Sequence, residues 1–284
     1  ARRQRQMCIR DRRKAKEFVK QREYLPNSMV IVGAKKSGKR TFARYVAAEL
    51  GYDCIFIENK VDDIRDMIEL ASSLAQPTLF VVQVAGMSIG AKNSLLKVTE
   101  EPPKNVHICM LAYTEGDVLD TLISRSWVVT LLPYSTDEVS HYLERYVKSS
   151  KDILKMAPMF SSPGQVQFLV QNHGKEGLGL YLEKVQFFYD NIFEASSSNA
   201  LKMVDWFKLK DTDTREDALI PELFLEIAMN YIGYENRKIQ DTEVLLANYG
   251  LLQLVAKCLG TVSTKGKNKL FALNKLVKEV QEIG

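Results

Sequence analysis

A glycine- and lysine-rich run ending at Thr41 has the residue types and spacing that bind phosphate. Gly33, Gly38 and Lys39 match the pattern G-x-x-x-x-G-K-[ST]. In that pattern, backbone N–H groups turn toward an anion and the lysine reaches the β- and γ-phosphates of a nucleotide. The last position is Arg40 rather than Ser or Thr. Because a guanidinium cannot coordinate a cation, this loop is predicted to lack the usual ligand for Mg²⁺.

The remaining loop residues complete the predicted nucleotide contacts. The candidate nucleotide-binding set is Gly33, Lys36, Ser37, Gly38, Lys39, Arg40 and Thr41, with further positive charge at Lys35. Thr41 does not replace the missing ligand, because it points about 100° further round the helix. An apolar run before the loop and an amphipathic run after it favour a genuine phosphate loop between strand and helix. The alternative is a glycine-rich turn without a ligand.

Hydrolysis of a bound nucleotide also needs carboxylates at the end of a neighbouring strand, one for the metal and one to activate water. The candidate strand, TLFVVQVAGM, has Gln83, Val84 and Gly86 where these acids are needed. A valine can neither polarise water nor hold a metal-bound water. This loss is therefore stronger evidence against hydrolysis than Arg40.

Short apolar runs alternate with amphipathic stretches through the first half of the chain. The apolar runs are MVIVG, CIFIE, TLFVVQVA, VHICMLAY and WVVTLL. Continuously apolar strands separated by helices indicate a parallel sheet covered on both faces. Residues 13–132 are thus predicted to form an α/β domain that positions the loop. Beyond this domain the pattern is helical, and Ser135 or Thr136 with Glu138 marks a helix start.

Length and composition are those of an ordinary globular protein: 284 residues, of which 46% are hydrophobic. We find no apolar run near the roughly 18 residues that suggest a membrane span, and no signal segment, so a cytoplasmic protein without membrane contact is expected. The four cysteines are far apart, without a C-x-x-C pair, and are interpreted as reduced thiols. The three histidines are scattered, and no metal site is predicted.

The formal charge of +4 resides in the first residues of the chain. Residues 1–12, ARRQRQMCIRDR, hold five Arg against one Asp, so the remaining chain is near neutral. Net charge is then no argument for nucleic-acid binding. The run MCIRDR also matches one reading frame of a common sequencing-adapter end, and the chain starts with Ala. We expect residues 1–12 to be a non-native or disordered tail, with a phosphate-contacting basic arm as the alternative.

An ordered set of motifs in residues 91–126 resembles the AAA+ clamp-loader family. That family carries Asn-x-Leu-Leu-Lys, an acidic pair before two prolines, a strand, and Ser-Arg-Cys. The corresponding residues here are Asn93 with Leu95 to Lys97, Glu100 to Pro103, and Ser124 to Ser126. Residues 61–71 and 268–280 are also similar to family helices. Within the family the chain is most similar to the delta-prime subunits of bacterial DNA polymerase III clamp loaders, or to a phage or reduced version.

This resemblance implies roles for individual residues. Arg125, with Ser124 beside it, is similar to the arginine finger that reaches into the ATP site of an adjacent subunit. The alternative is a surface or ion-paired arginine at a helix end. Tyr113 or Thr114 falls where the family's first sensor lies, and Gln165 stands where its ATP-binding members place an arginine sensor.

Several positions depart from the family pattern. Ser126 replaces the motif's cysteine, a small polar change that keeps the finger plausible. Bacterial delta-prime proteins usually carry a four-cysteine zinc module. In this chain the corresponding stretch contains only Cys54 and is too short for the module, so no zinc is expected. From the residues alone, Glu100 and Glu101 are interpreted as solvated charges at a helix end.

The resemblance implies a fold with an AAA+ P-loop parallel sheet covered by helices in 13–132, a helical lid in 133–195 and an all-α collar or oligomerisation domain in 196–284. It also implies a non-hydrolysing subunit of a hetero-oligomeric DNA replication clamp loader, in which ATP is bound without turnover. Its expected partners are other clamp-loader subunits, the sliding clamp and primed DNA. The alternatives are an ATP-hydrolysing motor subunit of the same complex and a P-loop scaffold module unrelated to replication.

Overall fold

The computed structural model describes residues 9–20, 24–58, 61–71, 73–193, 202–208, 218–264 and 268–282. The chain divides into two compact units, an N-terminal unit, Ala1–Pro133, and a C-terminal unit, Tyr134–Gly284. This division falls next to the predicted end of the α/β domain.

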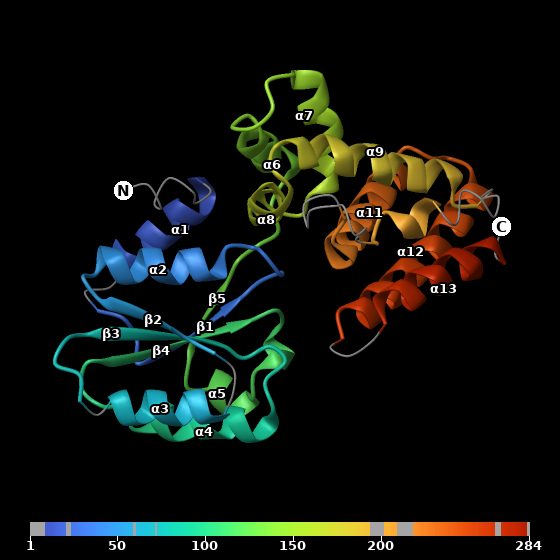
Figure 1. Ribbon diagram of the computed structural model, residues 1–284. Coiled ribbons are helices and arrows are strands. Elements are labelled where there is room, and N and C mark those ends of the chain that lie inside the picture. Colours follow the sequence, from blue (N-terminus) through green and yellow to red (C-terminus); the bar gives the residue numbers. More distant parts are fainter. Residues whose placement is uncertain are drawn as a thin grey trace. The chain divides into compact units, whose positions relative to one another are not determined.

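The N-terminal unit is built on a parallel sheet whose five strands, among the described residues, run in the order β2-β3-β4-β1-β5. The expected α/β fold is confirmed (Figure 1). β1 lies between β4 and β5, so the loop that follows β1 is flanked by the ends of both neighbours. The strands are β1 (Ser28–Val32), β2 (Asp53–Ile57), β3 (Thr78–Gln83), β4 (Val106–Ala112) and β5 (Trp127–Thr130).

Helices cover both faces of this sheet (Figure 1). Because side chains alternate along a strand, Met29 and Ile31 of β1 face one helical layer while Val30 and Val32 face the other. One layer is α1 (Ile9–Lys20) and α2 (Lys39–Glu49); the other is α3 (Val61–Ala71), α4 (Ile89–Glu100) and α5 (Asp120–Ile123). A short 3-10 helix, η2 (Glu115–Asp117), follows β4.

Helix α1 begins at Ile9, inside the segment 1–12 that the sequence predicts to be a tail. Phe18 of α1 packs edge-on against Phe42 of α2, with ring centroids 6.4 Å apart. Residues 1–8 lie outside the described residues, and the prediction for them stands as made.

The C-terminal unit is helical throughout its described residues. Its first helix starts as predicted, because Ser135 accepts a hydrogen bond from the N–H of Glu138 at 3.2 Å and the Glu138 carboxylate accepts one from the Ser135 N–H at 2.9 Å. The elements are α6 (Thr136–Leu143), α7 (Ser150–Met156), η3 (Ala157–Met159), α8 (Pro163–His173), α9 (Glu176–Asn191), α11 (Pro221–Asn236), α12 (Thr242–Val262) and α13 (Lys269–Gln281).

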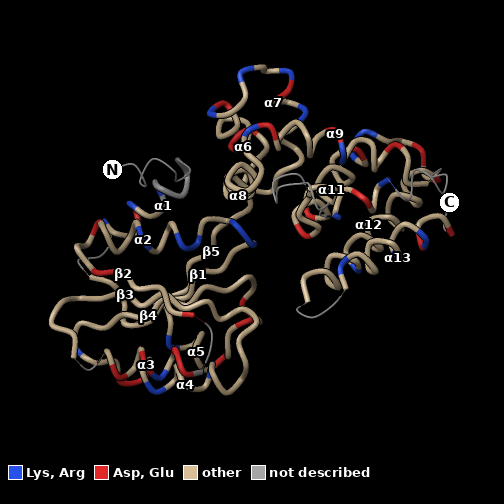
Figure 2. The backbone as a smooth tube through the Cα atoms, in the orientation of Figure 1, with Lys and Arg blue, Asp and Glu red and all other residues tan. Residues whose placement is uncertain are grey.

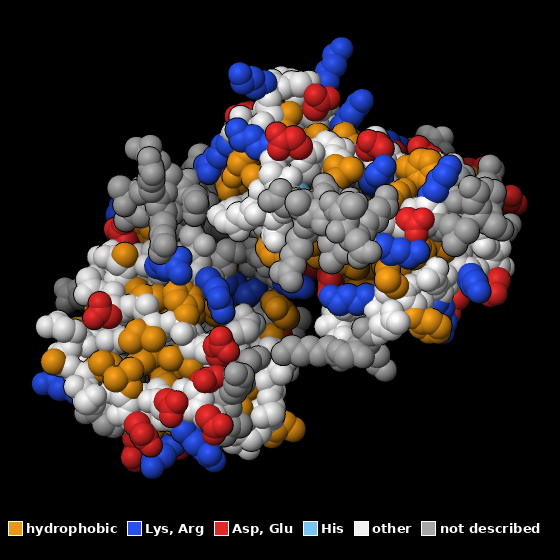
Figure 3. All heavy atoms as spheres, in the orientation of Figure 1, with side chains coloured by type: hydrophobic (Ala, Val, Ile, Leu, Met, Phe, Trp, Pro, Cys, Tyr) orange, Lys and Arg blue, Asp and Glu red, His pale blue; other side chains and the backbone are white. Residues whose placement is uncertain are grey.

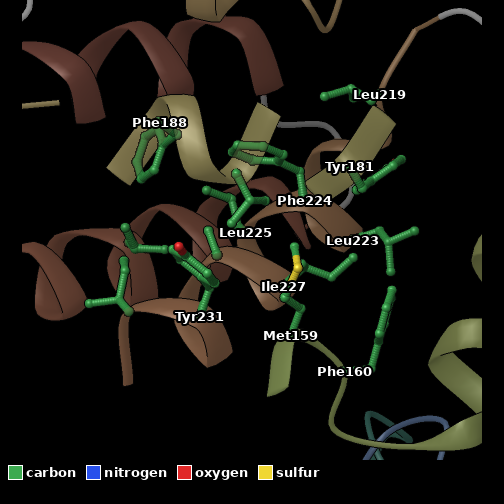
Figure 4. Close-up of a cluster of buried hydrophobic side chains, with 14 of the residues drawn as sticks. Met159, Phe160, Tyr181, Phe188, Leu219, Leu223, Phe224, Leu225, Ile227 and Tyr231 are labelled. Atoms are coloured by element: carbon green, nitrogen blue, oxygen red, sulfur yellow. The ribbon is translucent and has the colours of Figure 1, made fainter. Parts of the chain in front are cut away.

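One hydrophobic core extends from α6 to α13, so residues of the predicted lid and of the predicted collar contribute to the same cluster. Phe224 of α11 belongs to this cluster, as does Phe188 of α9 (Figure 4). The ring centroid of Phe224 lies 5.6 Å from that of Phe188 and 5.9 Å from that of Trp206. Phe188 is therefore a core residue. The boundary near residue 195 stays a prediction.

Helix α12 is the one described helix that is long and apolar enough to cross a membrane by length and composition. It contacts α11 and α13, and its residues Leu251 and Val255 are fully buried in the core. A core helix passes the same test, so this is weak evidence for a span. Only 22% of its most apolar window is buried, which leaves an exposed apolar surface on this helix.

Candidate functional site

The predicted phosphate loop forms a tight turn between β1 and α2. The backbone has positive φ at Lys36 (62°) and at Gly38 (89°), which immediately precedes the helix. The N–H of Ser37 donates to the Ala34 carbonyl at 3.1 Å. A Cβ at Gly33 would lie 2.9 Å from Ser37 Oγ, too close for any other residue without rearrangement. The strand–loop–helix context that the sequence predicts is thus present.

Lys39 lies inside this loop and is only 6% exposed. Its ammonium donates to the carbonyl of Gly33 and, at 2.7 Å, to the carbonyl of Ala34. Its Nζ also lies 4.8 Å from the ring centroid of Tyr113, within the range of a cation–π contact. The lysine expected to reach a nucleotide's phosphates is therefore held by groups of its own chain.

Burial lowers the pKa of Lys39 from 10.5 to about 8, and the nearby Asp117 carboxylate acts in the opposite direction. The folded protein therefore releases this proton at a lower pH than the unfolded chain does. Below pH 8 the cost of burying the charged lysine is fully present; between pH 8 and 10.5 it is progressively relieved, because the unfolded chain then binds more protons.

We expect the free energy of unfolding of the N-terminal unit to rise with pH between 8 and 10.5 relative to the Lys39→Met variant, which lacks this titration. Fluorescence of Trp127 in β5 can follow denaturant unfolding of this unit once Trp206 is replaced by Phe in both proteins. A stability difference between the two that stays constant across this pH range would contradict the shifted pKa.

Arg40 occupies the position of the magnesium ligand and is exposed. Its guanidinium lies 5.4 Å from the ring centroid of Phe56 in β2, and Arg44, one turn further along α2, lies 4.8 Å from the same ring. Both cations are engaged with the edge strand of the sheet. Arg40 therefore adds positive charge beside the loop and provides no oxygen for a metal.

The end of β3, where a hydrolysing P-loop enzyme needs acids, is hydrogen-bonded to β4. Gln83 Nε2 donates to the Leu111 carbonyl at 3.1 Å, and the N–H of Val84 donates to the same carbonyl at 3.0 Å. The Val84 side chain is fully buried. This strand end has no group that could activate water.

Asp117 is a feature of the loop's surroundings that sequence reasoning missed. Its carboxylate accepts hydrogen bonds from the N–H groups of Tyr113 (2.8 Å) and Thr114 (2.9 Å), directly after β4. Of the two residues considered for the first sensor, Tyr113 is the one whose ring lies over Lys39. The T-x-x-D spacing of a helix cap was the available signal for Asp117.

Arg125 follows α5 and is 43% exposed at its side chain. Its Nη1 donates to the Thr121 carbonyl at 2.8 Å, and its Nη2 lies 3.2 Å from Glu100 Oε1 at the end of α4. Glu100 is at the helix end and 48% exposed, as predicted for a solvated charge, and it also forms an ion pair with the candidate finger. Ser124 donates from its hydroxyl to the same Thr121 carbonyl at 3.2 Å.

Ser126 connects the turn that carries Arg125 to the start of β1 through hydrogen bonds. The Ser126 hydroxyl donates to the Leu122 carbonyl at 2.6 Å. The hydroxyl oxygen of Ser28 lies 2.6 Å from the hydroxyl oxygen of Ser126. Since the one proton of Ser126 is directed to Leu122, the buried Ser28 must donate to Ser126.

Replacing Ser126 with Ala should destabilise the N-terminal unit by about 1–3 kcal/mol, because the buried hydroxyl of Ser28 loses its acceptor. Ser124→Ala removes an exposed hydroxyl and should cost much less. Denaturant unfolding of the two variants, followed through Trp127, measures the difference. Equal stabilities would contradict the assigned hydrogen bond.

Gln165, which stands at the position predicted for the family's arginine sensor, lies at the start of α8 and is buried. Its Oε1 accepts from the N–H of Ser161 at 2.9 Å, and its Nε2 donates to Glu226 of α11 at 3.0 Å. Both ends of the amide are therefore used within the C-terminal unit.

The loop and Arg125 lie at opposite edges of the sheet. Parallel strands place all their carboxyl ends at one edge, and the loop follows Val32 at the end of β1. Arg125 precedes β5 and is tied through Ser126 to Ser28, the first residue of β1. At about 3.3 Å per residue, the two edges are about 13 Å apart along β1. The fold therefore brings together Lys39, Tyr113 and Asp117 at one edge and Arg125 with Glu100 at the other.

Cys54, Cys109 and Cys258 are free thiols, and Cys8 lies outside the described residues. Within the described ranges, no group of three or more His, Cys, Asp or Glu is placed to hold a metal ion.

Comparisons with known proteins find similarity to subunits of DNA polymerase III. Residues 53–135 match the model of the family described as DNA polymerase III, delta subunit. A DNA polymerase III subunit delta' from Buchnera aphidicola subsp. Baizongia pistaciae (strain Bp) is 24% identical over 150 residues, covering 51% of this chain and 44% of the relative. The chain thus matches less than half the length of that protein.

Among solved structures, a DNA polymerase III gamma subunit-related protein from Thermotoga maritima aligns over 96% of this chain and 99% of its own. The TM-score is 0.57 with 18% sequence identity. This similarity supports the fold of the whole chain, including its helical C-terminal part.

Proposed function

We propose that this chain, a member of the clamp-loader AAA+ family by its similarity to DNA polymerase III subunits, is a non-hydrolysing, delta-prime-like subunit that presents Arg125 to the ATP site of a neighbouring subunit. In this role Arg125 stabilises the charge that develops on the transferring phosphate from outside that site. Ser124, beside it, stays on the exposed turn that carries the arginine.

The separation of Arg125 from its own phosphate loop is the observation that carries this proposal. The two lie at opposite edges of one sheet, about 13 Å apart along β1. An arginine side chain on a turn tied to Ser28 cannot reach a nucleotide held after Val32 of the same chain. It is half-exposed and therefore accessible to another subunit.

The losses at the chain's own loop support the same proposal. Arg40 stands at the metal-ligand position, Gln83 and Val84 at the positions of the acids, and Gln165 is engaged with Glu226. Each loss removes a part that hydrolysis in cis requires.

We assign the loop a passive role toward ATP. The turn at Gly33, Lys36, Ser37 and Gly38 keeps the backbone shape of a phosphate site, and the start of α2 from Lys39 through Arg40 and Thr41 favours an anion. For Lys39 to bind the phosphates of ATP there, its ammonium would have to give up its hydrogen bonds to the carbonyls of Gly33 and Ala34. Nucleotide bound at this loop is not turned over.

The C-terminal unit is assigned the lid in 133–195 and the collar in 196–284 that joins the subunits of the ring. The exposed apolar residues of α12 support this role, since Leu246 and Tyr249 are 67% and 62% exposed. Other clamp-loader subunits are the direct partners of this surface, in a cytoplasmic hetero-oligomer.

Contact with the sliding clamp and with primed DNA belongs to the assembled complex. Figure 2 shows Lys and Arg positions interspersed with Asp and Glu positions along the backbone of each unit, and Figure 3 shows side chains of both signs on the visible face of each unit. Contacts to DNA from this subunit alone would therefore be weak and directed to backbone phosphates.

The test is the ATPase rate of the chain alone and then mixed with the clamp-loader subunits of the same genome, clamp and primed DNA. We expect the isolated chain to show no Mg²⁺-dependent turnover of ATP. We expect the mixture to form a complex that turns over ATP, and the mass of this complex should show that it contains the chain. Turnover by the isolated chain that Lys39→Met abolishes would instead favour a motor subunit. Failure to join the complex would favour an unrelated scaffold.

A further inference from the structure

Two groups of the chain hold the guanidinium of Arg125 at two different nitrogens. Nη1 donates to the Thr121 carbonyl at 2.8 Å, and Nη2 lies 3.2 Å from Glu100 Oε1. Because the guanidinium is planar, contacts at two nitrogens fix both the position and the plane of the group. Five N–H donors are present on it, so these two contacts leave donors for a phosphate.

Both contacts come from elements that the same core fixes. Glu100 is the last residue of α4. The side chain of Ser88, just before this helix, accepts a hydrogen bond from the N–H of Ala91, and the helix buries Leu95 against the sheet. Thr121 lies in α5, whose Leu122 is fully buried in that same cluster. The pairing is therefore set by the packing of α4 and α5 and does not depend on flexible surface segments.

The Glu100 contact is also weak enough to yield to a stronger anion. The side chains of Arg125 and Glu100 are 43% and 48% exposed, and ion pairs in such surroundings are screened by water. A phosphate, with more charge and several acceptor oxygens, makes stronger hydrogen bonds with a guanidinium. Glu100 can thus hold the arginine before the subunits meet without preventing its engagement.

We propose that Glu100 is a positioning residue for Arg125, whose guanidinium it keeps oriented for the ATP site of the neighbouring subunit. This inference rests on the proposed trans-acting role of Arg125. Without the carboxylate, the arginine samples other rotamers and must be ordered at the moment of reaction, which lowers the rate of the chemical step.

The test compares Glu100→Ala, Glu100→Gln and Glu101→Ala in the reconstituted complex, with ATPase kcat and KM measured for each. Glu101→Ala is the matched control, because Glu101 is exposed and adjacent to Glu100 and its replacement removes the same charge. We expect Glu100→Ala to lower kcat about 5-fold, with KM for ATP unchanged. Glu100→Gln should keep most of the rate, because its amide oxygen can still accept from Nη2, and Glu101→Ala should match the wild type.

A second comparison separates positioning from a general loss of structure. In the Arg125→Ala background, adding Glu100→Ala should not lower the ATPase rate further. The midpoint of thermal unfolding of the Glu100→Ala single variant should match that of the Glu101→Ala variant. Equal losses in Glu100→Ala and Glu101→Ala, or in Glu100→Ala and Glu100→Gln, would overturn the inference. A normal rate in Glu100→Ala beside a strong loss in Arg125→Ala would overturn it while leaving the proposed function intact. No effect of Arg125→Ala at all would overturn the proposed function.

Discussion

Replacing Arg125 with Ala is expected to lower the ATPase rate of the assembled complex by roughly 10³-fold at each ATP site that this chain completes. The physical reason is that the guanidinium stabilises charge present only in the transition state, so kcat falls while nucleotide binding is little changed. Steady-state ATPase measurements with clamp and primed DNA check this. ATP sites that other subunits complete will still turn over and set the ATPase rate that remains in the variant complex. Single-turnover measurements of phosphate release distinguish these sites from the one that Arg125 completes.

Two matched variants control for charge and for folding. Arg125→Lys keeps the charge but not the planar fork of donors, and should recover little of the rate. Arg65→Ala removes another exposed arginine of the N-terminal unit, paired with Asp62 at 3.5 Å, and should leave the rate unchanged. Equal losses in Arg125→Ala and Arg65→Ala would show that positive charge on this unit, and not the finger, is what matters.

Replacing Phe224 with Ala is expected to destabilise the C-terminal unit by about 3–5 kcal/mol, the usual cost of deleting a buried aromatic ring. Phe224 is 1% exposed, and its ring centroid lies 5.3 to 5.9 Å from those of Phe188, Trp206 and Phe207. Because one core spans the helices on both sides of residue 195, the whole unit should lose stability together.

The chain's two tryptophans make this measurable, since Trp206 reports on the C-terminal unit once Trp127 of the N-terminal unit is replaced by Phe. In that background, denaturant unfolding should shift strongly for Phe224→Ala. It should barely shift for Phe271→Ala, whose side chain is 68% exposed. A second transition that is insensitive to Phe224 would indicate that lid and collar unfold separately.

Most of the fold could be predicted because its signals are local. Continuous apolar runs marked the strands, and the S-x-x-E spacing at Ser135 marked the start of α6. The loop from Gly33 to Lys39 could be identified because each residue type meets a local backbone or charge requirement. The missing acids at Gln83 and Val84 could likewise be read from their position after a strand.

The contacts that were missed join residues far apart in the chain. Nothing near Glu100 in the sequence indicates that it lies 3.2 Å from Arg125, because the packing of α4 against α5 creates the pair. Asp117 beside Lys39 depends in the same way on β4 lying next to β1 in the sheet. Sequence patterns specify elements, whereas ion pairs between elements depend on tertiary packing.

The most direct test of a subunit that completes a neighbouring ATP site without hydrolysing ATP itself is to inactivate one phosphate loop at a time in the assembled complex. With Lys39→Met in this chain, the complex is predicted to hydrolyse ATP at the wild-type rate. With the phosphate-loop lysine of the neighbouring subunit replaced by Met, the site that Arg125 completes is predicted to be silent. A loss of turnover caused by Lys39→Met in an intact complex would contradict this account and identify the chain as a motor.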